Sequence, residues 1–276
     1  MQASYRLAMA LVVAGTVLSV WIVLAMRGTQ DGAEHRIAAG RPLVVGYAIE
    51  APFAFLDDSG RVTGEAPEVL RDVLHDLQIG EPIWLHVEFG DLIHELLSRR
   101  IDVIAAGMYI TPERSRKILF TRPTALVRGA LLVRPEYAET YTSMAAIAHN
   151  NEARLAVLAG SVEYAAARAL GMKPPKLLVF PDARSVAAAV MQKSADGASL
   201  SDVSLRYLQA QACCHGLVLI EAADSANMID RPAFAFRFED QALRDAIDTK
   251  LAAYLGSPRH RATVAPFGFL PEQPTP

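Results

Sequence analysis

The sequence predicts an α/β fold made of two lobes around a cleft. Short apolar segments alternate with helical patterns between residues 42 and 106, and the same alternation starts again at residue 130. Strands and helices that alternate at short spacing favour βαβ units and a mainly parallel sheet. With 276 residues, 52% of them hydrophobic, the chain has enough apolar material for two cores.

The N-terminal segment is long and hydrophobic. Residues 7–26 carry no charged side chain and lie between Arg6 and Arg27. About 20 apolar residues suffice to span a bilayer as a helix, so residues 1–27 are predicted to be a hydrophobic transmembrane anchor or a signal peptide. The length favours the anchor, whereas Val23-Leu24-Ala25 has the small-residue character of a cleavage site. Either way, the chain from a linker at residues 28–41 onward is expected outside the cytoplasmic membrane.

The first lobe is predicted to combine residues 42–133 with residues 226–270. Apolar positions recur at helical spacing in its helices, and its strands are short apolar or alternating runs. In chain order, strands are expected at 42–48, 83–88, 101–106 and 234–238, and helices at 66–77, 90–99 and 240–255.

The second lobe is predicted from residues 134–225, with crossovers near 134 and 225 and a tail at 271–276. Arg134-Pro135 interrupts the strand at which the pattern restarts. The expected strands are 130–133, 154–159, 177–180, 197–200 and 217–221, and the expected helices are 162–170 and 183–192.

Charge and cysteine content exclude several classes of protein. The net charge is -3 and no cluster of lysines and arginines is present, which argues against a nucleic-acid partner. The only cysteines, Cys213 and Cys214, are adjacent, so a disulfide framework is absent and two thiols are expected. The seven histidines have no metal-ligand spacing, and neither a metal nor a cofactor is predicted.

The most informative stretch is Ala105 to Arg114, where a buried strand ends in polar side chains. Gly107 permits close backbone approach, and Tyr109 adds an aromatic ring. Thr111 before a proline is typical of a helix N-cap, which places Arg114 in the first helical turn. A guanidinium there can hold a carboxylate with two parallel hydrogen bonds. The alternative is that Arg114 only pairs with a surface acid such as Glu113.

Other polar and aromatic residues also fall where strands end, which is where open α/β sheets bind ligands. Glu50 offers a carboxylate at the end of the first strand, and Ser161 and Glu163 open a helix in the second lobe. Aromatic faces attract cations, and four rings follow strand ends: Phe53, Phe55, Phe89 and Tyr109. Such a set suits a zwitterion with a diffuse positive charge, although these rings could instead fill the core and Glu163 could be an ordinary acid at a helix start.

These residues resemble a known family over residues 42 to 270. Residues 107–114 stand where the bacterial family 3 extracellular solute-binding proteins have their ligand-carboxylate arginine motif, and Gly160-Ser161 stands where their second-lobe loop lies. The resemblance implies a type II periplasmic-binding-protein-like fold. It also implies a monomeric receptor that closes over a small ligand and delivers it to an ABC permease in the cytoplasmic membrane.

Within the family, residues 50–55, 63–69, 88–90, 105–114 and 180–183 are most similar to the ectoine and 5-hydroxyectoine receptors. The resemblance implies an aromatic box, acids that pair with the ligand's ring nitrogens, and an arginine for its carboxylate. It assigns the box to Phe53, Phe89 and Tyr109, the acids to Glu50 and Glu163, and the carboxylate contact to Arg114.

Two positions depart from the family patterns. Ser201 stands where amino-acid receptors carry an aspartate for the ligand's α-ammonium, which disfavours a primary amine, although the neighbouring Asp202 could turn inward. Val162 stands where ectoine receptors tend to carry a hydroxyl. A polar amino-acid receptor is therefore the main alternative, and a periplasmic dehydratase or a membrane-tethered sensor lobe are further ones.

Overall fold

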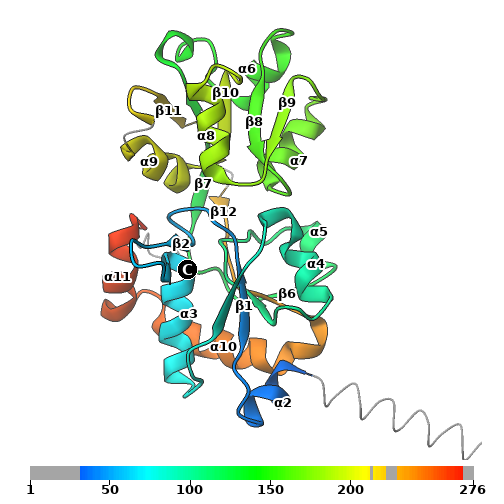
Figure 1. Ribbon diagram of the computed structural model, residues 1–276, viewed down its shortest axis with the longest axis vertical. Coiled ribbons are helices and arrows are strands. Elements are labelled where there is room, and N and C mark those ends of the chain that lie inside the picture. Colours follow the sequence, from blue (N-terminus) through cyan, green and yellow to red (C-terminus); the bar gives the residue numbers. More distant parts are fainter. Residues whose placement is uncertain (1–31, 212–213, 222–228, 270–276) are drawn as a thin grey trace, which may run out of the picture.

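The computed structural model describes residues 32–211, 214–221 and 229–269, and it shows two α/β lobes, each built on its own sheet (Figure 1). The strand order is β4-β1-β5-β13-β6 in lobe 1 and β11-β7-β10-β8-β9 in lobe 2. The two-lobed α/β fold predicted from the alternating pattern is confirmed.

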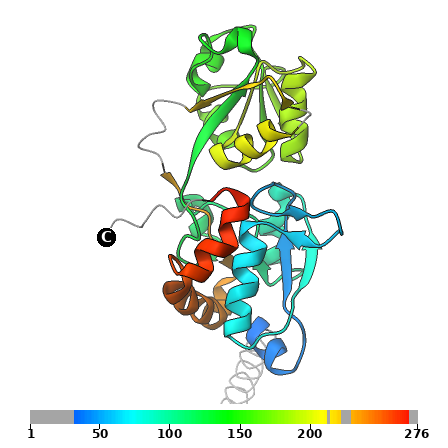
Figure 2. The ribbon, with the colours of Figure 1, turned by 90° about the vertical axis from the view of Figure 1, so that its left-hand side faces the viewer.

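Lobe 1 places a mixed sheet between helices. β1 pairs in parallel with β4 and β5, whereas β13 is antiparallel to β5 and β6. Helix α3 packs against α10 and α11, and Figure 2 shows α3 and α11 side by side. Its elements are β1 (Val44–Tyr47), β2 (Phe55–Leu56), β3 (Val62–Thr63), α3 (Glu65–Asp76), β4 (Ile83–His86), α4 (Leu92–Leu97), β5 (Val103–Ile104), α5 (Pro112–Ser115), β6 (Leu119–Phe120), β13 (Ala235–Phe236), α10 (Gln241–Tyr254) and α11 (Pro258–Val264).

Lobe 2 has a parallel core flanked by antiparallel strands. β10, β8 and β9 are parallel, and β7 runs antiparallel to both β10 and β11. Its elements are β7 (Val127–Val133), α6 (Met144–His149), β8 (Leu155–Leu158), α7 (Val162–Ala169), β9 (Leu177–Phe180), α8 (Ala183–Met191), β10 (Gly197–Ser201), α9 (Asp202–Ala210), β11 (Val218–Glu221) and β12 (Ile229–Asp230).

The crossover between the lobes lies earlier than the boundary expected at residues 133 and 134. All of β7 is hydrogen-bonded within the second sheet, from Gly129 opposite Ser201 to Val133 opposite Gly197. The sequence pattern recognised only its apolar second half and took Arg134-Pro135 as the border. The return crossover is β12, which pairs with the first residues of β7.

The segment expected as a linker at 28–41 contains a helix, α2 (Ala33–Ala38). Ala33 is buried, and its N–H donates to Asp240 Oδ1 at 2.7 Å. Asp240 and Asp102 both pair with the buried Arg237 guanidinium, so α2 is fixed to lobe 1 at the end far from lobe 2 (Figure 1). The hydrophobic residues 7–26 lie outside the described part of the chain. Within the described part, none of the helices has both the length and the apolar character needed to cross a membrane.

The lobes are closed on each other. A methyl group added at Gly160 would lie 2.7 Å from the Cα of Gly90, so lobe 2 meets lobe 1 here through backbone alone. One continuous apolar cluster also contains buried residues from both lobes, Phe89 and Leu92 from lobe 1 and Leu158 and Leu200 from lobe 2 among them.

Candidate ligand-binding site

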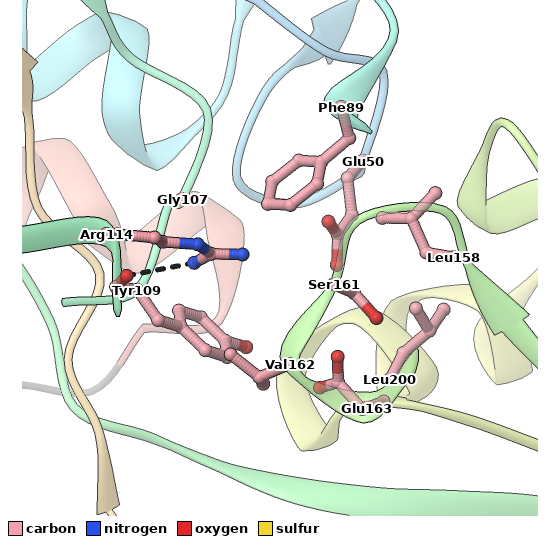
Figure 3. A pocket seen from close by; sticks show the side chains of 10 residues that line it. All are labelled: Glu50, Phe89, Gly107, Tyr109, Arg114, Leu158, Ser161, Val162, Glu163 and Leu200. Atoms are coloured by element: carbon pink, nitrogen blue, oxygen red, sulfur yellow. Dashed lines mark hydrogen bonds between the residues drawn. The ribbon is translucent and has the colours of Figure 1, made fainter. Parts of the chain in front are cut away.

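A cavity lies between the lobes at the ends of their central strands (Figure 3). Its empty space, including the part open to solvent, is about 250 Å³. The residues around it come from both lobes: Glu50, Phe89, Gly107, Tyr109, Arg114, Leu158, Ser161, Val162, Glu163 and Leu200. Seven of the ten predicted site residues are therefore brought together, and Phe53, Thr111 and Ser201 lie outside this lining.

Arg114 reaches the cavity from the first turn of α5. The predicted N-cap is present, because Thr111 Oγ1 accepts a hydrogen bond from the Arg114 N–H at 3.2 Å. Arg114 Nη1 donates to the Tyr109 carbonyl and Nη2 to the Gly160 carbonyl, both at 2.9 Å, so the guanidinium touches both lobes. Burial lowers the pKa of Arg114, and the charge of Glu163 acts against that effect. The group stays cationic, since arginine is effectively always protonated in proteins.

Glu50 faces Arg114 from the end of the first strand. Its backbone pairs with that of Ala54 across a tight turn, and its side chain is 7% exposed. Ser204 Oγ in lobe 2 donates to Glu50 Oε1 at 2.9 Å. Burial first, and then the negative charge of Glu163, raise the pKa of Glu50 to about 7, although Ser204 and Arg114 favour its charged form.

Glu163 is the matching acid of lobe 2. Ser161 caps α7 by accepting from the Tyr164 N–H, which places Glu163 in the first turn of that helix. Burial is the main reason that the pKa of Glu163 is raised to about 7; Asp230 raises it further, and Arg114 and Ser161 lower it. Two carboxyl groups with matched, raised pKa values thus face one guanidinium across the cavity.

Two of the three predicted box aromatics line the cavity. The Phe89 ring lies with its centroid 5.7 Å from Arg114 Cζ, and the Tyr109 ring lies opposite (Figure 3). The pKa of Tyr109 is raised well above its ordinary value, mainly by burial, so its hydroxyl stays neutral.

Phe53 lies beneath the cavity in the core of lobe 1. It is 1% exposed and contacts Tyr109 edge to face at a centroid distance of 6.3 Å. Gly107, with φ of +67°, passes over this ring so closely that a Cβ there would lie 2.4 Å from Phe53 Cγ. The structure therefore makes Phe53 a support for Tyr109, and the core-filling alternative describes it better than the box assignment.

Neither Ser201 nor Asp202 lines the cavity. Ser201 caps α9 by accepting from the Ser204 N–H, and its side chain also bonds to Tyr109. The Asp202 carboxylate accepts from the Arg128 N–H at 3.1 Å, so it is held against β7. The inward rotation considered from the sequence is not found.

Two polar residues near the site escaped prediction. Ser204 lies in α9, a helix that was not predicted because it begins in a loosely patterned segment, yet it bonds to Glu50 across the cleft. Asp230 lies in the two-residue β12, too short for any periodic signal, and its charge acts on Arg114, Tyr109 and Glu163. Leu158 and Leu200 also line the cavity, but they were not predicted as site residues because the sequence shows them only as apolar residues of strands.

A wider groove, about 2080 Å³ including open solvent, shares Phe89 with the lining of the cavity. The loop after β1 and the helices α8 and α9 form its walls, and Phe55 contacts Tyr207 across it at a centroid distance of 5.6 Å.

The described residues contain no cluster of histidines, cysteines and acids that could hold a metal ion. Cys214 is buried, whereas Cys213 lies outside the described residues, so the expected pair of thiols stays a prediction.

The profile of the bacterial extracellular solute-binding proteins, family 3, matches residues 43–268. The chain belongs to this family. Its members bind small solutes outside the cytoplasmic membrane and work with ABC transporter permeases, and the relatives are mostly amino-acid binders.

Two curated proteins and one crystal structure illustrate which members of the family this chain is similar to. The chain is 27% identical over 241 residues to a probable amino-acid ABC transporter periplasmic-binding protein of Sinorhizobium fredii, covering 83% of this chain and 78% of that protein. It is 32% identical over 85 residues to the L-arginine-binding protein of Pseudomonas aeruginosa, covering 30% of this chain and 32% of that protein. The crystal structure of EhuB in complex with hydroxyectoine superposes with a TM-score of 0.81 at 26% identity, covering 88% of this chain and 94% of EhuB.

Proposed function

We propose that this protein is the receptor of an ABC importer for ectoine, 5-hydroxyectoine or a similar compatible solute. The observation that carries the proposal is the separation of charge in the cavity, where one guanidinium lies on one side and two carboxyl groups on the other, between two aromatic rings. A small zwitterion with a delocalised cation complements this arrangement, because each of its charges meets an opposite one.

The charged groups are kept available for a ligand. Among the described residues, Arg114 forms no ion pair, and its two Nη atoms donate hydrogen bonds to backbone carbonyls. Glu50 bonds to a neutral hydroxyl. A ligand that supplies both a carboxylate and a cation would compensate groups that burial has made costly to charge.

The position of Asp202 supports a ring cation over a primary ammonium. An α-ammonium needs several acceptors around one point, and the carboxylate expected to provide them is engaged with β7. The alternative of a polar amino-acid receptor keeps a specific observation in its favour, since Glu163 lies where it could accept from an ammonium, and the similar P. aeruginosa protein is named for L-arginine.

Calorimetric titration of the purified protein tests the proposal with ectoine, 5-hydroxyectoine, L-arginine and L-glutamine. We expect tight binding of ectoine and a rise in melting temperature at saturating ligand, because a ligand that binds only the folded state at 100 times its Kd adds about 2.7 kcal/mol of stability. Heat with an amino acid and none with ectoine would assign the cavity to the alternative.

The N-terminal segment is proposed to export or tether the receptor on the periplasmic side. Mass spectrometry of the mature protein measures this directly. A product that begins near Met26 indicates cleavage, and an intact Met1 in the membrane fraction indicates an anchor.

A further inference from the structure

Asp230 lies beside the cavity, although it is neither one of the site residues predicted from the sequence nor part of the cavity lining. Its backbone pairs with Val127 at the start of β7. The chain that follows runs antiparallel to the stretch that carries the site, with the Ile110 N–H donating to the Arg231 carbonyl at 3.0 Å and Pro232 opposite Tyr109. This crossover strand therefore holds Asp230 at the hinge side of the cavity.

The carboxylate of Asp230 acts on three site groups, two from the stretch 105–114 of lobe 1 and one from the start of α7 in lobe 2. Its charge adds to the rise in the pKa of Tyr109 and of Glu163. Burial raises the pKa of Asp230 itself to about 6, and the positive charge of Arg114 acts against that rise. The side chain is partly buried, and among the described residues the charge of Arg114 is the only favourable interaction that acts on its carboxylate. Its field therefore extends into the space between the lobes.

The cavity consequently holds more negative than positive charge. Glu50, Glu163 and Asp230 are three carboxyl groups against the single guanidinium of Arg114. A ligand with one carboxylate and one cation fits this balance, and a second cation improves it. A second carboxylate, as in acidic amino acids, would face Asp230 and both glutamates.

We propose that Asp230 sets the net charge of the ligands that this receptor accepts, admitting neutral zwitterions and cations and excluding dicarboxylates. The proposal rests on the proposed function for the location of the site, but not for the identity of the ligand. Asp230 acts through its field and not by direct contact, so it is a specificity determinant that tunes the groups lining the cavity.

Binding of L-arginine, ectoine and L-glutamate to the wild type and to Asp230→Asn tests the proposal. We expect the affinity ratio of L-arginine to L-glutamate to fall about 10-fold in Asp230→Asn, equivalent to about 1.4 kcal/mol, because the variant no longer repels the second carboxylate of L-glutamate. The affinity for ectoine should change much less. Asp202→Asn is the matched control, because it removes a nearby carboxylate that is occupied by the Arg128 N–H while keeping an acceptor oxygen.

A second measurement needs no ligand. The charge of Asp230 raises the pKa of Glu163, so carbon-detected NMR titration of the Glu163 carboxyl should show a lower midpoint in Asp230→Asn than in the wild type or in Asp202→Asn. The other charged groups that act on Glu163 and Glu50 in this cavity, Arg114 among them, are unchanged in all three proteins.

An unchanged ligand ratio together with an unchanged midpoint would overturn the proposal, as would tight binding of L-glutamate by the wild type. Failure of ectoine to bind while L-arginine binds would instead contradict only the proposed function, since the effect of Asp230→Asn would then be read on L-arginine.

Discussion

Arg114 combines two tasks in one side chain. It presents a planar fork to the cavity, and through Nη2 it holds the Gly160 carbonyl of the opposite lobe. Lysine preserves the charge but offers a single point of attachment, so it cannot serve both partners with the same geometry.

Arg114→Lys should therefore weaken ligand binding about 10- to 100-fold, since hydrogen bonds to charged groups contribute roughly 1.5–3 kcal/mol. Calorimetry with the tightest ligand found for the wild type measures this loss. Arg116→Lys, two residues further on and exposed, is the matched control and should bind like the wild type. Equal affinities for the two variants would mean that Arg114 does not hold the ligand.

Glu65 is a second buried acid, inside lobe 1 and away from the cavity. It is fully buried at the start of α3, and the Thr124 hydroxyl is the polar group that acts on its carboxyl. Burial raises its pKa to about 7, with the Thr124 hydroxyl offsetting part of the effect. Protonation is thus favoured by folding, so the stability linked to Glu65 is fully present below about pH 4.3, the ordinary glutamate value, and is lost as the pH rises toward 7.

Glu65→Gln should flatten the fall in thermal stability between pH 5 and pH 8. At pH 8 we expect the variant to be more stable than the wild type by about 1–3 kcal/mol, because one pKa unit corresponds to about 1.4 kcal/mol. Melting curves across this pH range measure the slope, and Glu139→Gln, which changes an exposed acid, should leave it unaltered. Parallel curves for Glu65→Gln and the wild type would contradict the assignment.

At the scale of elements, the short loop before α7 brings the lobes together. Gly160 has φ of +72° and touches Gly90 of the other lobe, whereas Gly171, just after α7, has φ of +82° and faces open space. An alanine at either position would adopt a left-handed backbone conformation, which destabilises the folded state by roughly 1–2 kcal/mol in both cases. Only the alanine at 160 also meets the opposite lobe.

Gly160→Ala should therefore reduce ligand affinity at least 10-fold more than Gly171→Ala, although both variants lose similar stability. Titration calorimetry and thermal melts on the pair separate the two effects. If both variants bind ligand equally well, closure tolerates the added methyl group and the contact with Gly90 is not limiting.

The elements that the sequence predicted well are those with a strong period or a strong cap. The apolar run before Gly107, the Thr111 cap and the helix start at Ser161 were all located, because their signals are local. The strands β6 and β12 were missed because two paired residues have no period. The helix α9 was missed because it follows a strand without a break. The place of Phe53 outside the cavity lining could not be predicted, because it depends on Gly107, 54 positions away in the sequence, crossing over its ring.

For the whole molecule, closure couples to proton binding. The raised pKa values of Glu50 and Glu163 belong to the closed arrangement, because the lobes bury both groups and bring them together. When the lobes separate, both carboxyls regain water and their ordinary pKa values of about 4.3. Closure of the empty receptor is therefore favoured most at low pH, and the preference is lost as the pH rises to about 7.

Small-angle X-ray scattering without ligand should show a larger radius of gyration at pH 8 than at pH 5. The Glu50→Gln, Glu163→Gln double variant should stay compact at both values, since its cavity no longer gathers negative charge. A wild-type radius that does not depend on pH, or that grows on acidification, would contradict this coupling.

Hydrogen bonds between the lobes, among them those from Ser204 to Glu50 and from Arg114 to the Gly160 carbonyl, involve only the receptor's own atoms. An empty receptor held shut by them would show a permease the same outer face as a loaded one. It would then occupy docking places without delivering cargo, so net import would peak at an intermediate receptor abundance. A higher external pH would reduce this competition, because it would open the empty receptors before those that hold a ligand.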